Sequence, residues 1–149
     1  MSLTLDAPTE PAGRQQLETL MASPRRPGIV DTLDFNLVEV DDGRVVFEGS
    51  PSLAVYNPIG TVHGGYAATL LDSACGCAVQ SKLTAKQAYT TLELKIAYHR
   101  AMTETTGPVR AEGRVVQLGR RAAFAEATLK GLDGRLYASA TSTLLVFDR

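Results

Sequence analysis

The sequence has few cysteines, and this shortage excludes two kinds of site. Its 149 residues include only two cysteines, Cys75 and Cys77. On a helix, two residues at this spacing point to different sides, so they cannot form a disulfide with each other. There are also only two histidines, which lie far apart in the sequence. We therefore expect free thiols and no metal site.

The chain also has no large excess of positive or negative charge and no long hydrophobic run. The formal net charge is -1, so the chain lacks the basic field of a nucleic-acid-binding protein. The longest apolar run, over 67–79, is interrupted by Asp72 and is too short to span a bilayer. Free thiols and the lack of a secretory apolar segment near residue 1 lead us to expect a cytoplasmic protein without nucleic-acid or membrane partners.

What is present is enough apolar sequence for one globular domain. Hydrophobic residues make up 44% of the chain, and its length suits a single domain. The first thirty residues are rich in Pro, Thr, Arg and Gly. We expect residues 1–30 to form an N-terminal extension with a short helix over 13–22, and residues 31–149 to form the domain.

One long helix and several strands follow. The helix is predicted over 64–82, and because it is apolar on nearly every side we expect it to be buried. Along the strand at 89–100, Leu92, Leu94, Ile96 and Tyr98 alternate with Thr91, Glu93, Lys95 and Ala97. The predicted strands cover 32–40, 44–50, 89–100, 107–118, 122–130 and 136–147. This order predicts an α+β fold in which an antiparallel sheet wraps around the long helix.

The start of the long helix is a candidate binding site for a carbonyl oxygen. The first N–H groups of a helix have no partner within it, and that end is electropositive. Gly64 and Gly65 leave these N–H groups uncovered, so a substrate carbonyl can reach them, and Gly64 N–H is the preferred donor. The alternative is a glycine-rich helix start that binds no ligand.

Asp72 is the candidate catalytic acid. It lies two turns into the helix among Leu70, Leu71 and Ala74, and a buried carboxylate without a partner is costly. It could serve as a general base on water or as a nucleophile that forms a mixed anhydride. The alternative is an acid that faces solvent, which the apolar surroundings disfavour.

His63 and Asn57 each have a functional and a structural interpretation. His63 could orient a substrate carbonyl, or it could cap the helix. Asn57 could hold water or substrate through its amide, but Asn before Pro58 is also an ordinary turn residue.

Two further pairs are candidates for contacts to substrate. Thr90 and Thr91 begin a strand, where threonine is common for structural reasons. Arg120 and Arg121 occupy a hairpin tip, where two guanidinium groups suit phosphate but where solvated charge is also usual.

Together these residues resemble the hotdog-fold acyl-CoA thioesterases, specifically the phenylacetic-acid-degradation (PaaI-like) type. The resemblance covers about residues 33–147. It is carried by N-P-I-G-T-V-H-G-G-Y-A-A-T-L-L-D-S-A, which begins at Asn57, and by T-T-L-E-L-K-I-A-Y-H-R, which begins at Thr90. Asn57, His63 and Asp72 have the family's spacings of six and nine residues.

The resemblance implies a hotdog domain that hydrolyses acyl-CoA thioesters, with an aromatic or medium-chain acyl group. It implies a homodimer, often a dimer of dimers (a homotetramer), with active sites between subunits and no cofactor beyond the CoA of the substrate. Gly64 would contact the thioester oxygen, supported by His63, and Asp72 would come from the opposite subunit.

The same resemblance implies roles for the remaining candidates. Asn57 would position water or substrate, Thr91 would hold the hydrolytic water with Thr90 as the fallback, and the turn at Arg120 would meet the CoA nucleotide. The chain departs from the family by lacking a proline after Arg100 and by having His99 where an apolar residue is typical.

Two other functions stay open at this point. One is a hotdog-fold enoyl-CoA hydratase or dehydratase, for which the sequence lacks the matching acid and histidine pair. The other is a non-catalytic acyl-CoA binding protein. The intact Asp72 argues against this second alternative.

Overall fold

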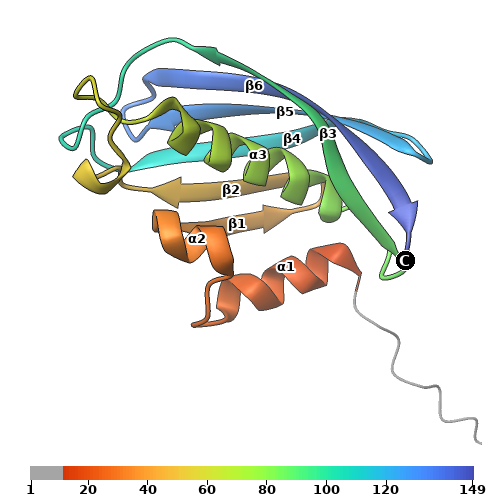
Figure 1. Ribbon diagram of the computed structural model, residues 1–149. Coiled ribbons are helices and arrows are strands. Elements are labelled where there is room, and N and C mark those ends of the chain that lie inside the picture. Colours follow the sequence, from red (N-terminus) through yellow and green to blue (C-terminus); the bar gives the residue numbers. More distant parts are fainter. Residues whose placement is uncertain (1–11) are drawn as a thin grey trace, which may run out of the picture.

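A long helix lies across the concave side of a curved antiparallel sheet in the computed structural model, which describes residues 12–149 (Figure 1). The helix is α3, Gly64–Gln80. Two short N-terminal helices, α1 (Gly13–Ala22) and α2 (Gly28–Leu33), pack beside β1. The predicted α+β architecture is therefore confirmed.

The sheet has six strands in the order β1-β2-β4-β5-β6-β3, and every neighbouring pair is antiparallel. All six predicted strands are present. Their bounds are β1 Phe35–Asp41, β2 Arg44–Gly49, β3 Gln87–Tyr98, β4 Val109–Leu118, β5 Ala122–Gly131 and β6 Leu136–Asp148. β3 joins the sheet through β6 and forms one of its two edges.

The strand predicted from residue 32 begins three residues later, and that start was wrong. The β-branched Thr32 suggested a strand, but its hydroxyl donates a hydrogen bond to Gly28 C=O within α2. Asp34 ends this helix in the left-handed conformation, with φ of 55°. The chain enters β1 only at Phe35. Residues 53–55 form a single 3-10 turn, Leu53–Val55.

The helix α1 covers the residues of the short helix expected in the extension, and it packs closely on the domain. Leu17 is buried, and Gly13 N–H donates to Leu83 C=O at 3.0 Å. A Cβ at Gly13 would lie 1.9 Å from the Gln80 carbonyl oxygen, so only glycine fits there. The expected division between extension and domain at residue 30 stays a prediction, and α2 runs across it.

Small side chains allow α3 to approach the sheet closely. A Cβ at Gly113 of β4 would lie 2.2 Å from the Ala74 carbonyl oxygen of α3. Around this contact Leu70, Leu71 and Val79 are completely buried. Each such side chain contributes roughly 1.5–3 kcal/mol of stability through burial.

The expectation that α3 is buried on every side was wrong for the single chain. Gly65 is exposed, and Thr69, Asp72, Ser73 and Cys77 are half-buried along one stripe of the helix. The sheet is curved around only one side of α3, so this stripe stays open. Among residues 12–149, no helix has both the length and the hydropathy needed to cross a bilayer.

Candidate functional site

The start of α3 holds one free backbone donor, Gly64 N–H. His63 caps the helix, because its Nδ1 accepts the Gly65 N–H at 2.8 Å and its C=O accepts the Tyr66 N–H at 3.0 Å. Nδ1 is therefore the acceptor of this hydrogen bond. Gly64 N–H has no acceptor within residues 12–149. The capping interpretation of His63 thus describes its hydrogen bonding, and the cap leaves Gly64 N–H available.

The loop before the helix is organised by Asn57. Its Oδ1 accepts the N–H groups of Ile59 and Thr61, each at 3.1 Å, and its Nδ2 donates to Thr61 Oγ1 at 2.9 Å. The side chain therefore acts as a turn residue in this structure. A contact between Asn57 and water or substrate stays a prediction.

The carboxylate of Asp72 has one hydrogen-bonding partner from the sheet. Thr91 Oγ1 donates to Asp72 Oδ1 at 3.0 Å. The sequence alternation had put Thr91 on the face opposite Leu94. A β-bulge between Thr91 and Glu93 shifts the register of β3, so Thr91 faces α3 and Leu92 is left at the exposed edge. Of the two candidate threonines, Thr91 is therefore the one next to Asp72.

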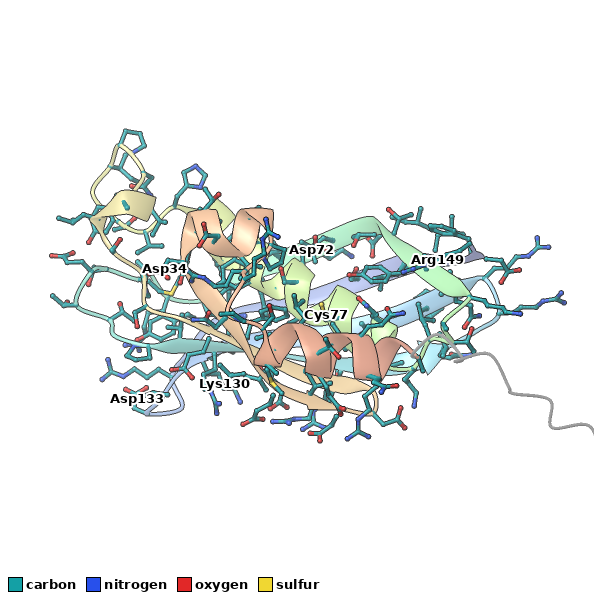
Figure 2. The ribbon with its side chains drawn as sticks, turned by 90° about the horizontal axis from the view of Figure 1, so that it is seen from below. Asp34, Asp72, Cys77, Lys130, Asp133 and Arg149 are labelled. Carbon is teal, nitrogen blue, oxygen red and sulfur yellow. The ribbon has the colours of Figure 1, made fainter. Side chains whose placement is uncertain are left out.

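A cavity of about 460 Å³ lies beside Asp72, along the open stripe of α3. One wall comes from the N-terminal helices and β2, and the other from β3; Figure 2 labels Asp72 and Cys77 on α3 between these elements. The lining is mostly apolar or neutral. It consists of Leu20, Pro27, Val30, Phe47, Asp72, Ser73, Cys77, Tyr89, Thr90 and Thr91.

The other titratable groups in this cavity are neutral at ordinary pH. Burial raises the pKa of the Cys77 thiol to about 12, and its hydrogen bond with Tyr89 has a smaller, opposite effect. Burial also raises the pKa of Tyr89 well above that of a free phenol. Asp72 is thus the one carboxyl group in an otherwise uncharged lining.

A second cavity, of about 390 Å³, surrounds the start of α3. His63, Gly64, Tyr98, His99 and Arg100 line it together with smaller apolar side chains. Within it His99 Nε2 lies 2.8 Å from Ser139 Oγ. His99 is therefore tied to β6, and Arg100 is exposed at the edge of the cavity.

The predicted residues do not all meet within one chain. Gly64 and Asp72 are eight residues apart on α3, which separates them by roughly 12 Å along the helix axis. The exposed pair Arg120 and Arg121 lies at the hairpin between β4 and β5, at the end of the molecule opposite the start of α3 (Figure 1). Two groups of predicted residues are in direct contact, Asp72 with Thr91 and His63 with Gly65.

Sequence reasoning missed several residues that line these cavities. Tyr98 touches the start of α3, Cys77 and Tyr89 lie beside Asp72, and Leu20 and Val30 come from the N-terminal helices. Apart from Cys77, which follows Asp72 on the same helix, these contacts join segments far apart in the sequence, so no local pattern marks them. Within the part of the chain that the structure describes, no cluster of three His, Cys, Asp or Glu residues could hold a metal ion.

The fold matches those of solved thioesterase-family structures. A thioesterase family protein from Silicibacter pomeroyi is 28% identical with a TM-score of 0.81, and the match covers 93% of this chain and 100% of that one. A conserved protein of Pseudomonas aeruginosa is 29% identical with a TM-score of 0.75, covering 87% and 98% of the two chains.

The E. coli PaaI protein from the phenylacetic acid degradation operon shares the fold, with 17% identity, a TM-score of 0.78 and coverage of 91% and 94%. A comparison with curated proteins gave no match. The hotdog fold is thereby confirmed, as is the expected PaaI-like resemblance at the level of family and fold. A family model described as the thioesterase superfamily matches residues 59–138, so this chain belongs to that superfamily.

Proposed function

We propose that this protein hydrolyses acyl-CoA thioesters to a free acid and CoA. The observation that carries this proposal is the carboxylate of Asp72, held by Thr91 at the wall of a largely apolar cavity. A cavity of about 460 Å³ whose lining is uncharged apart from Asp72 suits an aromatic or medium-chain acyl group. The charge needed to activate water would come from Asp72 alone.

Gly64 N–H would stabilise the negative charge that develops on the thioester oxygen. A helix start favours such charge, and one such donor is typically worth about 3 kcal/mol in the transition state. Water, activated by Asp72 and held by Thr91, would attack the carbonyl carbon while the C–S bond breaks and the CoA sulfur takes up a proton. Direct attack by the Asp72 carboxylate to form a mixed anhydride is the alternative within the same site.

The active site would need two copies of the chain, because Gly64 is too far from Asp72 of its own chain. The free edge of β3 supports a dimer, since an unpaired strand edge is a ready template for another strand. On β3, Thr91 contacts Asp72 and Tyr98 contacts Gly64. Antiparallel pairing of two β3 strands about a two-fold axis near Leu94 would place Gly64 of one copy against Asp72 of the other.

The remaining assignments complete this proposal. His63 holds the helix start, Asn57 positions the loop or a water, Gly65 and Thr90 contact substrate, and Arg120 with Arg121 meets the phosphates of the CoA nucleotide. We also propose that these dimers pair into a homotetramer and that the protein is cytoplasmic.

Replacing Asp72 by Asn tests the proposal. Asp72→Asn keeps the side-chain shape but removes the charge, so turnover of acyl-CoA should fall at least about 100-fold, the scale of a lost general base. Release of CoA is followed with a thiol reagent over aryl- and alkyl-CoA esters. Asp133→Asn, at an exposed hairpin, is the matched control and should keep wild-type activity. Undiminished turnover by Asp72→Asn would refute this role.

A further inference from the structure

We infer that Tyr98 is a positioning residue that clamps the Gly64–Gly65 peptide and so aims Gly64 N–H. Tyr98 O–H donates to Gly64 C=O at 2.8 Å. The N–H at the other end of the same peptide group, that of Gly65, donates to His63 Nδ1 at 2.8 Å. The two side chains therefore hold this peptide group from opposite ends.

The clamp also explains why both residues are glycine. A Cβ at Gly64 would lie 3.0 Å from the Tyr98 hydroxyl oxygen and 3.1 Å from its Cζ. A Cβ at Gly65 would lie 2.9 Å from His63 Nδ1. Each glycine thus makes room for one of the two clamping side chains.

The consequence is a helix start with one donor left over. Gly65 and Tyr66 donate to His63, while Gly64 N–H has no acceptor within residues 12–149. Gly64 N–H belongs to the preceding peptide group, whose His63 C=O accepts the Tyr66 N–H. Because that group is held and the Gly64–Gly65 group next to it is clamped, the direction of Gly64 N–H is fixed before a ligand arrives. Such preorganisation is what makes a backbone donor effective toward a developing oxyanion.

This inference rests on the proposed function for its catalytic part, and Tyr98→Phe tests that part. The variant keeps the ring and removes only the hydroxyl, so we expect kcat for acyl-CoA to fall about 5- to 10-fold with KM within about twofold. Tyr66→Phe is the matched control, because the buried Tyr66 hydroxyl lies two residues further on and has no hydrogen-bond partner among residues 12–149. It should leave kcat unchanged.

The contact itself is tested by thermal unfolding, without any substrate. Gly64→Ala should lower the melting temperature in the wild-type background, because the new Cβ pushes Tyr98 away. In a Tyr98→Ala background the same change should leave the melting temperature unchanged or raise it, since alanine is favoured over glycine in a helix. This change of sign is specific to the contact between the two residues.

Three results would overturn the positioning role of Tyr98. These are wild-type kinetics in Tyr98→Phe, an equal loss of kcat in Tyr66→Phe, or a change in the KM of Tyr98→Phe without a change in its kcat. An equal effect of Gly64→Ala in both backgrounds would overturn the clamp. If the wild-type protein hydrolysed no acyl-CoA ester, the thioesterase proposal and the catalytic part would both fail, and the melting temperatures would still decide whether Tyr98 restrains Gly64.

Discussion

The chemistry of a single residue, Asp72, depends on a hydroxyl that comes from another element. Thr91 Oγ1 is its hydrogen-bonding partner, and the cavity around it is otherwise uncharged. A hydrogen bond to a charged group is worth about 1.5–3 kcal/mol. The position of the carboxylate therefore depends on Thr91 as well as on α3.

Thr91→Val should lower kcat about tenfold or more, because valine keeps the β-branched shape and removes the donor to Asp72. Thr90→Val changes the neighbouring residue in the same way and should cost clearly less. Steady-state CoA release from both variants provides the comparison. If Thr90→Val proved the more damaging of the two, the water-holding role would belong to Thr90.

Sequence reasoning predicted Asp72 and Gly64 from the residues, but it preferred Thr91 over the fallback Thr90 only through the family resemblance. The strict alternation along β3 placed Thr91 with Glu93, away from the helix. The bulge at Leu92 changes which side chains of β3 face the helix, so that Thr91 faces α3, and no local sequence signal marks this bulge. The contact between Tyr98 and Gly64 was missed for a related reason, because the two residues are 34 positions apart and meet only once the sheet has formed.

The helix α3 is the central element, and its two thiols make its packing sensitive to alkaline pH. Both cysteines are free, and Cys75 faces the sheet with no exposed surface. Burial raises the pKa of Cys75 from 9.0 to about 12, and nearby Asp72 adds to the effect. The folded state therefore disfavours the thiolate that the unfolded chain forms readily.

Stability should consequently fall as the pH rises above about 9. Below that pH the thiol is protonated in both the folded and the unfolded state, so it makes the free energy of unfolding no more dependent on pH. Above it, only the unfolded state loses the proton. The free energy of unfolding then falls by up to about 1.4 kcal/mol per pH unit for each thiol. Urea unfolding of the wild type and of Cys75→Ala between pH 8 and 11 measures this. The variant should be less stable at pH 8 but should lose less stability on going to pH 11. Parallel curves would show that Cys75 does not cause the alkaline loss.

The elements themselves were largely predictable, because their periodicity and turns are strong. The helix at Gly64–Gln80 and the six strands lie within three residues of their predicted bounds. The helix α2 was not predicted, since Ile29, Val30 and Thr32 favour a strand by propensity. Its formation depends on Asp34, which ends the helix in the left-handed conformation, and on packing beside β1.

For the whole molecule, the open stripe of α3 and the free edge of β3 are the features that a single chain leaves unsatisfied. Leu92 lies at the bulge on that edge and is 58% exposed. An unpaired edge strand of this length is a ready template for another strand, and Leu92 adds apolar surface to it. A second copy on this edge would cover Leu92 and complete the site at Asp72.

Leu92→Glu should convert the assembly toward monomers and abolish turnover, because it places a carboxylate from each copy near the proposed two-fold axis. Leu132→Glu is the matched control: Leu132 is 67% exposed at the hairpin between β5 and β6 and should tolerate the charge. Light scattering after size exclusion gives the mass of each variant. An active Leu92→Glu dimer would mean that the copies associate through another surface.

Complementation between two inactive variants tests the shared site most directly. Asp72→Asn removes the carboxylate from one copy. Gly64→Pro removes the amide donor at the first helix position, where the helix backbone accepts proline but the added ring displaces Tyr98. Each variant alone should be inactive, with its fold checked by circular dichroism. Co-expressed at equal levels, they should recover about a quarter of wild-type turnover, because half of the dimers are mixed and each mixed dimer has one intact site. No recovery from dimers shown to be mixed would mean that Gly64 and Asp72 do not act together across two copies.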